Sequence, residues 1–379
     1  MSTEIKENNT SRIDLQLLKK KKVNLAVFGH GNVGGKLLDQ ILESAASISE
    51  RKHIVLNVFA VANSGQLLFQ TDGIDENWRN KLKAEKAGWD ISEVIKFARQ
   101  YNLKNLIAID NTGSTEFVEH YPKLIEGGFN LVSSNKHPNT RDLEFYHELR
   151  SLLQRHEKEF FYETNVGAGL PLIDTIKLLH LSGENITRIR GVFSGSLSYI
   201  FNTFSENDDS FGNVLKKAMN YGFTEPDPRE DLSGNDVGRK LLILARELDL
   251  HHELTDVNIE NLIPKPLRTI PKHEFLEQLD ALDVKFHIKK RNQKKDHVLR
   301  YIGDLHGDLS EVNGGTLDVK LVSVPRDSTL GQLSNSDSLF EIYTQNYAQH
   351  PITIKGAGAG GAVTARGVLG DILRLSDKL

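Results

Sequence analysis

A lysine and an aspartate four residues apart are the first candidates for chemistry in this sequence. Asp236 and Lys240 share one face of an expected helix, 234–249, while Val237, Leu241 and Leu244 lie on its apolar stripe. On spacing alone, such a pair is an ordinary surface ion pair that contributes about 0.3 to 0.5 kcal/mol. If the helix borders a closed site, the lysine is instead a candidate proton donor. The spacing favours the surface pair and leaves the catalytic interpretation open.

An acidic loop with two prolines precedes this helix. Residues 225–231 read Glu-Pro-Asp-Pro-Arg-Glu-Asp, and with Asp236 they place five carboxylates within twelve residues. The prolines restrict the backbone. The loop is either a rigid acidic pocket for a cationic substrate group or a solvated surface loop. Composition alone favours the solvated loop.

A glycine motif of the form G-x-G-x-x-G begins at Gly29 and ends at Gly34, between an apolar strand, 23–28, and a helix. Missing Cβ atoms at these glycines let the backbone approach a pyrophosphate, whose charge is received by the helix N-terminus. A second strand at 54–62 completes a βαβ unit. The motif therefore predicts a dinucleotide site. The acid that usually follows the second strand is replaced by Ala62-Asn63-Ser64, so no preference between NAD and NADP is indicated.

A second glycine set, Gly356, Gly358 and Gly361, also follows a strand. Only 18 residues remain after it, too few for another βαβ unit. We interpret it as a close-packing turn or as a tail that folds back beside the cofactor.

Polar residues follow two further apolar strands. Ser133-Ser134-Asn135-Lys136 comes after the strand at 129–132, and Thr112 follows the strand at 106–109. Open α/β sheets bind ligands at the carboxyl ends of their strands. Position thus favours a site role for Lys136 about as strongly as a surface role.

The alternation of apolar strands with helices predicts an α/β fold with a Rossmann-type doubly wound parallel sheet. We expect a dinucleotide-binding domain at 21–155, joined by the C-terminal segment 346–379. A second α+β domain for substrate binding and dimerisation is expected at 156–345. Its clearest elements are an apolar helix at 171–181 and strands at 186–193 and 317–324.

Composition excludes several classes of function. The 379 residues are 39% hydrophobic and 26% charged, with a formal net charge of −4, so we expect no nucleic-acid or membrane partner. Residues 1–20 lack a signal-peptide pattern, and no apolar run is long enough to span a membrane, so we expect a cytoplasmic protein. The absence of cysteine excludes disulfides and a thioacyl intermediate, and hence a phosphorylating aldehyde dehydrogenase. No histidine pair has zinc-ligand spacing.

Together these motifs resemble homoserine dehydrogenase, most closely the dehydrogenase portion of the bifunctional aspartokinase and homoserine dehydrogenase chains. The resemblance runs from about residue 23 to 375. It rests on VFGHGNVGGKLLDQI, SSNK, TNVGAGLP, SGSLSYIFN, GFTEPDPREDLSGNDVGRKLLILARE and GAGAGGAVTARGVLGDIL. It implies the NAD(P)H-dependent reduction of L-aspartate 4-semialdehyde to L-homoserine, a step toward threonine, methionine and isoleucine.

The resemblance also assigns roles to residues of this sequence. Lys240 matches the proton-transferring lysine, Asp236 beside it matches a catalytic residue that holds the substrate, and Lys136 matches a lysine between nicotinamide and substrate. Glu225 matches the residue that binds the substrate amino group, and we place Asp231 and Ser196 with it as substrate-binding residues. The expected cofactor-binding residues are Gly29, Gly31, Asn32, Val33, Gly34, Ala62, Thr112, Lys136 and Gly360. A structural monovalent cation, Na⁺, is expected at Glu163 with the carbonyls of Val166, Ala168 and Leu170.

Two other functions stay open at this point. A Rossmann domain alone does not establish turnover, so the chain is alternatively a non-enzymatic dinucleotide sensor. Another NAD(P)-dependent amino-acid dehydrogenase differs by needing free ammonium in the reductive direction. We also expect a homodimer or homotetramer in which the helix at 171–181 and the strand at 186–193 build a sheet that is completed against a second copy of the chain.

Overall fold

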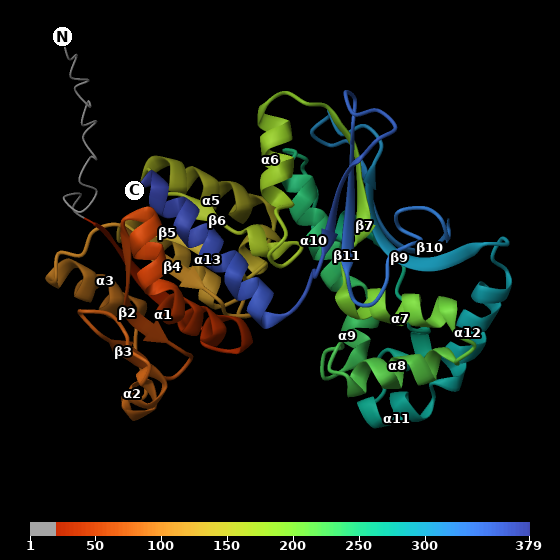
Figure 1. Ribbon diagram of the computed structural model, residues 1–379, viewed down its shortest axis with the longest axis horizontal. Helices are drawn as coiled ribbons and strands as arrows, with labels where there is room; N and C mark the ends of the chain where they lie inside the picture. The colour runs from red at the N-terminus through yellow and green to blue at the C-terminus, as the bar shows by residue number, and fades with distance from the viewer. Residues whose placement is uncertain (1–19) are drawn as a thin grey trace, which may run out of the picture.

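Two six-stranded sheets organise residues 20–379, the part of the chain that the computed structural model describes (Figure 1). The segment 1–20, for which the sequence predicts no signal peptide, lies outside the described residues up to position 19. Within residues 20–379, none of the helices has the length and apolar character needed to cross a bilayer.

The first sheet has the strand order β3-β2-β1-β4-β5-β6 and confirms the predicted Rossmann-type architecture. All neighbouring strands pair in parallel except β3, which is antiparallel to β2. The central strands are buried on both faces, as continuous apolar runs require. The strands are β1 (Lys21–Phe28), β2 (Ile54–Ala62), β3 (Leu67–Phe69), β4 (Leu106–Asp110), β5 (Asn130–Ser133) and β6 (Phe160–Phe161).

Helices cover both faces of this sheet. The first and last helices of the chain lie side by side on one face, where Leu37 and Val368 join the apolar cluster of Leu25 and Ile107 (Figure 1). The other face packs against α3, α4 and α5 through Val94, Leu124 and Leu149. The helices are α1 (Asn32–Lys52), α2 (Trp78–Ala84), α3 (Ile91–Gln100), α4 (Tyr121–Glu126), α5 (Leu143–Arg155) and α13 (Gly361–Lys378).

The second sheet has the order β12-β11-β7-β9-β10-β8, and confirms the predicted α+β class of the second domain. Its pairs are antiparallel except for the short pairing of β8 with β10. The strands are β7 (Ile186–Val192), β8 (Asn258–Ile259), β9 (His297–His306), β10 (Thr316–Pro325), β11 (Ser338–Thr344) and β12 (Ile352–Gly356). The helices are α6 (Ile173–Leu181), α7 (Gly195–Glu206), α8 (Phe211–Asn220), α9 (Pro228–Leu232), α10 (Asn235–Arg246), α11 (Lys272–Glu277) and α12 (Asp280–Arg291).

The chain crosses between the sheets at points that differ from the expected boundaries. β6 pairs with β5, so the first sheet extends to Phe161 rather than ending before 156. β12 pairs with β11 in the second sheet, so of the segment 346–379 only α13 returns to the first sheet. The alternation of Ile352, Thr353, Ile354 and Lys355 is typical of an antiparallel strand covered on one face, which explains this placement.

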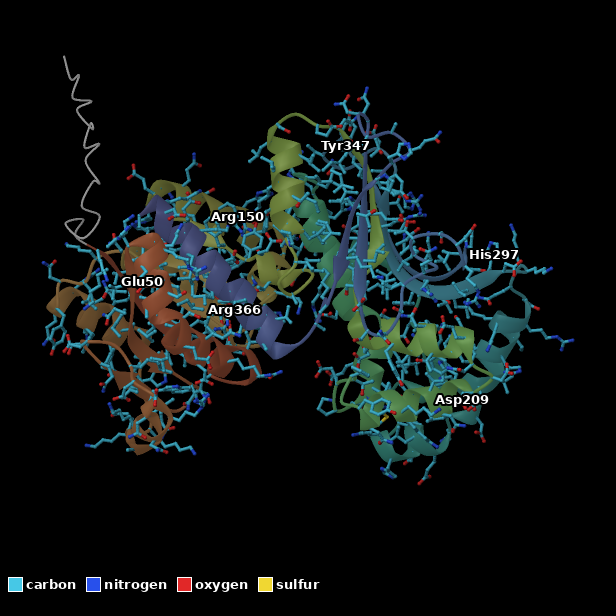
Figure 2. All side chains as sticks on the ribbon, viewed as in Figure 1. Glu50, Arg150, Asp209, His297, Tyr347 and Arg366 are labelled. Atoms are coloured by element: carbon cyan, nitrogen blue, oxygen red, sulfur yellow. The ribbon has the colours of Figure 1, made fainter. Side chains whose placement is uncertain are left out.

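A buried polar network fastens the two units together. The Tyr162 hydroxyl donates to Glu247 at the end of α10, at 2.6 Å, and Lys177 of α6 lies 3.3 Å from the same carboxylate. Arg150 of α5, labelled in Figure 2, donates to the Tyr162 oxygen at 3.1 Å. Burial raises the pKa of Tyr162, so the phenol stays protonated and able to donate. Side chains from α5, α6 and α10 thus fix the relative position of the two sheets.

Candidate functional site

A cavity of about 590 Å³ lies between the two units, and residues from both line it. The first unit contributes the start of α1 and the loop after β5, and the second contributes the acidic loop and α10. The expected site residues around this cavity are Asn32, Val33, Lys136, Ala168, Ser196, Glu225, Lys240 and Gly360. An adjoining cavity of about 340 Å³ is lined by Lys136, Glu225, Asp231 and Asp236. The structure therefore brings together residues that are up to 328 positions apart in the sequence, as Asn32 and Gly360 are.

One carboxylate joins the two lysines at the centre of this cleft. Lys240 Nζ lies 2.8 Å from Asp236 Oδ2 and donates to the Phe193 carbonyl at 2.7 Å, and its side chain is only 11% exposed. Lys136 Nζ lies 3.3 Å from the other oxygen, Asp236 Oδ1. Desolvation opposes ionisation of Asp236, but the two ammonium groups outweigh it and hold its pKa well below the ordinary range. The pair is therefore not an isolated surface ion pair, because a lysine from the other unit shares the aspartate.

The local fold of α10 explains why these side chains face the cleft. Val237, Leu241 and Leu244 are buried against the second sheet, so the helix has only one orientation that satisfies its apolar stripe. Gly238 allows the close packing, since a Cβ there would lie 2.7 Å from Ile259. Lys240 consequently lies on the side of α10 that borders the cavity.

The acidic loop contributes two linked carboxyl groups. Asp231 accepts hydrogen bonds from Ser196 Oγ at 2.6 Å and from the Glu225 backbone N–H at 2.8 Å. Desolvation raises the pKa of Asp231 and of Glu225, and for Glu225 the neighbouring carboxylates of Asp231, Glu230 and Asp236 raise it further. A cation bound among them would relieve this repulsion. Asp227 differs, because it pairs with Arg229 and caps α9.

The first glycine loop leaves open space on the side where a pyrophosphate would approach. A Cβ at Gly29, where φ is +81°, would lie 2.9 Å from the Asn111 backbone, and one at Gly34 would lie 1.9 Å from the Gly29 oxygen. A Cβ at Gly31 would have no heavy atom within 4 Å. Gly29 and Gly34 are thus required by packing, and Gly31 leaves room for a ligand at the start of α1.

The second glycine set lies against the first. A Cβ at Gly361 would lie 2.5 Å from Asn32 Oδ1, and Gly360 has a φ of +119°. The turn at 356–361 therefore folds back beside the first glycine loop, and α13 begins next to α1.

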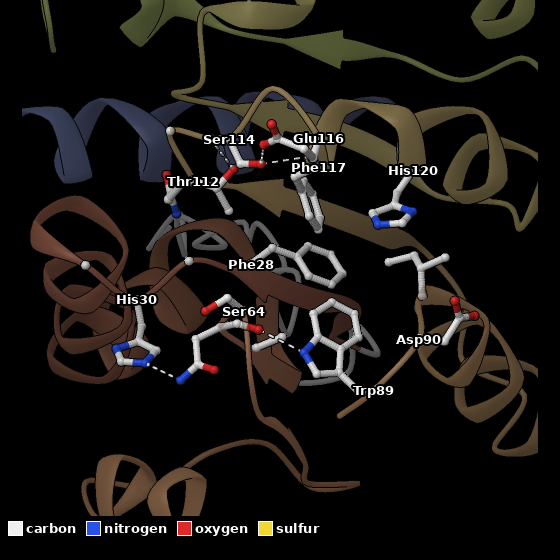
Figure 3. A pocket seen from close by; sticks show the side chains of 17 residues that line it. Phe28, His30, Ser64, Trp89, Asp90, Thr112, Ser114, Glu116, Phe117 and His120 are labelled. Atoms are coloured by element: carbon white, nitrogen blue, oxygen red, sulfur yellow. Dashed lines mark hydrogen bonds between the residues drawn. The ribbon is translucent and has the colours of Figure 1, made fainter. Parts of the chain in front are cut away.

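A second cavity, of about 640 Å³, lies at the carboxyl ends of β1, β2 and β4 (Figure 3). Four expected cofactor residues line it: Gly29, Gly31, Ala62 and Thr112. The sequence did not predict its aromatic wall. In this wall Trp89 stacks on Phe28 with 5.9 Å between ring centroids, and Phe117 packs against Phe28 with 4.8 Å between centroids. The wall and the glycine loop suit the adenosine half of a dinucleotide, whereas the cleft cavity begins at Asn32 and Val33, the next residues of the chain. Phe28 ends a predicted strand, but Trp89 and Phe117 lie outside the predicted strands, so no periodic signal could have identified them.

Oxygen atoms of the residues expected to bind Na⁺ also accept hydrogen bonds within the protein. Both oxygens of the buried Glu163 carboxylate accept backbone N–H groups at the start of α6, from Ile173 at 2.7 Å and Asp174 at 2.9 Å. Burial and the nearby Asp174 raise the pKa of Glu163 to about 8. The Leu170 carbonyl accepts from the Leu172 N–H at 2.9 Å. Carboxylate and carbonyl oxygens are hard donors of the kind that Na⁺ takes, so the donor set fits such an ion, although Glu163 also caps a helix. Within residues 20–379, no group of three His, Cys, Asp or Glu side chains is arranged to hold a metal ion.

Two sequence families match the chain along most of its length. The family described as homoserine dehydrogenase matches residues 171–373, and the NAD binding domain of homoserine dehydrogenase matches residues 29–163. The chain belongs to the homoserine dehydrogenase family. The boundary of the NAD binding domain falls just after β6, in agreement with the pairing of that strand in the first sheet.

Individual relatives show the same extent of similarity. Homoserine dehydrogenase of Schizosaccharomyces pombe is 33% identical over 94% of this chain and 96% of its own. The bifunctional aspartokinase/homoserine dehydrogenase of Haemophilus influenzae is 37% identical over 94% of this chain but 43% of its own. The chain thus spans about two fifths of the length of such bifunctional relatives.

Solved structures share the fold. A Candida auris protein of unknown function is 31% identical with a TM-score of 0.84, covering 94% of this chain and 99% of that one. A hyperthermophilic archaeal homoserine dehydrogenase in complex with NADPH is 25% identical with a TM-score of 0.70, covering 94% and 98%.

Proposed function

We propose that this member of the homoserine dehydrogenase family catalyses the NAD(P)H-dependent, reversible reduction of L-aspartate 4-semialdehyde to L-homoserine. The observation that carries the proposal is the convergence of Lys240, Asp236 and Lys136 with Glu225 around one cleft. That cleft also reaches both glycine loops. A pure dinucleotide sensor needs no such cluster of lysines and carboxylates beside its cofactor site.

The bound nicotinamide supplies the hydride that the aldehyde carbon receives. Lys240 Nζ is held between Asp236 and the Phe193 carbonyl, and from there it donates a proton to the oxygen that becomes the alcohol. Lys136 adds positive charge near that oxygen, while Asp236 stays ionised and keeps the two ammonium groups together. Glu225 and Asp231 bind the substrate ammonium group, which orients the aldehyde toward Lys240.

A turnover assay tests this function. The oxidation of NADPH, and separately of NADH, is followed by absorbance with L-aspartate 4-semialdehyde, and the reverse reaction is followed with L-homoserine. We expect turnover in both directions without added ammonium. A requirement for ammonium in the reductive direction would favour an amino-acid dehydrogenase, and cofactor binding without turnover would favour a sensor.

The same proposal includes a structural Na⁺ at Glu163 and at the carbonyls of Val166, Ala168 and Leu170. It is supported by the hard oxygen donors. Asp174 and Asp371 add two carboxylates close to Glu163, and the guanidinium of Arg374 pairs with all three. A cation there would connect the loop before α6 to the N-terminus of that helix. The cytoplasmic location expected from the sequence also stays a proposal, which fractionation of the producing cells tests.

We further propose a symmetric dimer that uses the region of α6 and β7. β7 is paired on both edges, by β11 and β9, so a second copy cannot extend the sheet from this strand. Instead, Leu178 and Leu181 of α6 are 71% and 83% exposed, which favours burial of that helix against another chain. Sedimentation at low micromolar concentration should show a species of twice the chain mass.

The substitution of Leu178 and Leu181 together by aspartate should shift this species toward the single-chain mass. The control is Val284→Asp, the same change at an exposed valine on α12, which should leave the mass of the sedimenting species unchanged. A wild-type protein that is folded, active and only of single-chain mass would contradict the dimer.

A further inference from the structure

The first glycine loop places an imidazole beside the end of β2. His30 stands between Gly29 and Gly31 and lines the cavity of about 640 Å³ together with Asn63 and Ser64 (Figure 3). In Rossmann-type domains, the residue at the end of the second strand meets the 2′ position of the adenosine ribose, usually with a carboxylate. Here that position is occupied by a neutral amide, and a histidine contacts it.

The hydrogen bonds of Asn63 define the state of this histidine. Asn63 Oδ1 accepts the backbone N–H groups of Gly65 at 2.8 Å and Gln66 at 2.7 Å, which fixes the orientation of the amide. Its Nδ2 therefore faces His30 Nε2, at 3.1 Å. An amide NH₂ group only donates, so His30 Nε2 must accept. This hydrogen bond requires the tautomer with the proton on Nδ1, and within residues 20–379 no hydrogen bond from that nitrogen is formed.

The opposite side of the ring is also held. His30 packs edge-on against the buried Trp78, with 5.7 Å between ring centroids. The guanidinium of Arg79 lies over the Trp78 ring at 4.4 Å and donates to both oxygens of Asp39, at 2.8 and 2.6 Å. The nearest arginine is therefore already balanced by a carboxylate, and the imidazole is positioned before any ligand binds.

The charges around the cavity give His30 particular weight. The residues that line it include the acids Asp90 and Glu116 but neither lysine nor arginine. The groups among them that can gain a positive charge are His30 and His120. His120 lies away from the end of β2, against the edge of Phe117 and near Asp90. His30 is thus the group at the 2′ position that can turn cationic.

We propose that His30 discriminates NADP(H) from NAD(H) through its protonation. The inference rests on the proposed function only in taking the cavity as the cofactor site. The neutral ring, with Asn63 and Ser64, accommodates the uncharged 2′-hydroxyl of NAD(H). Protonation of Nε2 breaks the hydrogen bond from Asn63. This protonation is favoured when the 2′-phosphate of NADP(H) pairs with the imidazolium. Because the cationic form is populated at lower pH, the affinity for NADP(H) should rise relative to the affinity for NAD(H) as the pH falls.

Half-cofactors test this directly, without turnover. Isothermal titration of the protein with adenosine 2′,5′-bisphosphate and with 5′-AMP, between pH 6.5 and 9, gives the ratio of the two dissociation constants. We expect the affinity for the bisphosphate, relative to that for 5′-AMP, to be about tenfold higher at pH 6.5 than at pH 9. His30→Gln should make the ratio nearly independent of pH. The 2′-phosphate titrates near pH 6 with either protein, so its own protonation cancels in the comparison.

Two further variants sharpen the test. His120→Gln removes the other histidine of the cavity and should leave the pH dependence of the ratio unchanged. Asn63→Asp keeps an oxygen for Gly65 and Gln66 but adds a negative charge at the 2′ position. It should weaken the binding of the bisphosphate more than tenfold and the binding of 5′-AMP less than threefold.

The outcomes separate this inference from the proposed function. A wild-type ratio that does not change with pH, or a His30→Gln protein that retains the wild-type pH dependence, would overturn the role of His30. The absence of turnover with either full cofactor would contradict the proposed function while leaving the half-cofactor result standing.

Discussion

Replacement of Lys240 with alanine should remove nearly all turnover while the affinity for cofactor stays near its wild-type value. Lys240 Nζ is enclosed and fixed by Asp236 and the Phe193 carbonyl, whereas the first glycine loop that borders the cofactor site belongs to the other unit. Loss of a positioned proton donor typically lowers the rate by about 10² to 10⁴. Steady-state rates with L-homoserine and fluorescence titration of NADPH measure the two effects separately.

Two other lysine variants make this prediction specific. Lys216→Ala removes an exposed lysine from α8 and should change neither quantity. Lys240→Arg keeps a positive charge beside Asp236 but does not release a proton near neutral pH, so it should also be inactive. A Lys240→Ala protein with more than about a tenth of wild-type turnover, a barrier change below about 1.4 kcal/mol, would show that Lys240 is not the essential proton donor.

The dinucleotide-binding half of the fold could be read from the sequence because its signals are local. The strand expected at 54–62 is observed with the same bounds, and the glycine motif lies between β1 and α1 as predicted. Continuous apolar runs and glycines between them are properties of neighbouring residues. No knowledge of the rest of the chain is needed to interpret them.

The second sheet was harder to predict because its strands depend on distant partners. β9 was missed in the segment 264–345, where the buried Arg300 interrupts an apolar pattern. Its guanidinium donates to the neighbouring Leu299 carbonyl and to the carbonyls of Leu330, Gly331 and Leu333, and the last three belong to the loop before β11. A charged residue that is buried in this way looks exposed in the sequence, since the compensating carbonyls lie some 30 residues away.

The site shows the same limit. The spacing of Asp236 and Lys240 favours a surface ion pair, and only the approach of Lys136 from the other unit changes that interpretation. The family resemblance supplied roles for Lys240, Asp236 and Lys136 that spacing could not, but it did not predict the contact between Lys136 and Asp236. The contact between His30 and Asn63 had no such support, because a residue between the glycines of G-x-G-x-x-G is unrestricted by the motif.

Glu225→Gln should raise the KM for L-homoserine at least about tenfold while the KM for the cofactor stays within about twofold. The substitution removes the charge that faces the substrate ammonium group but keeps the size of the side chain. Steady-state kinetics with each substrate varied in turn separate the two constants. Glu230→Gln provides a matched control, because it removes the same charge from the same loop at a residue that lines only the smaller cavity. It should change the KM for L-homoserine by less than threefold.

The pH dependence gives this prediction its sharpest form. Desolvation and the neighbouring carboxylates raise the pKa of Glu225, so its proton is gained at a higher pH than for an ordinary glutamate. The protonated form does not attract an ammonium group. The wild-type KM for L-homoserine should therefore rise as the pH falls through this raised pKa, and the rise should be smaller in Glu225→Gln, where only Asp231 remains to gain a proton. An unchanged KM in the variant, or the same rise at low pH in both proteins, would show that Glu225 does not bind the substrate ammonium group.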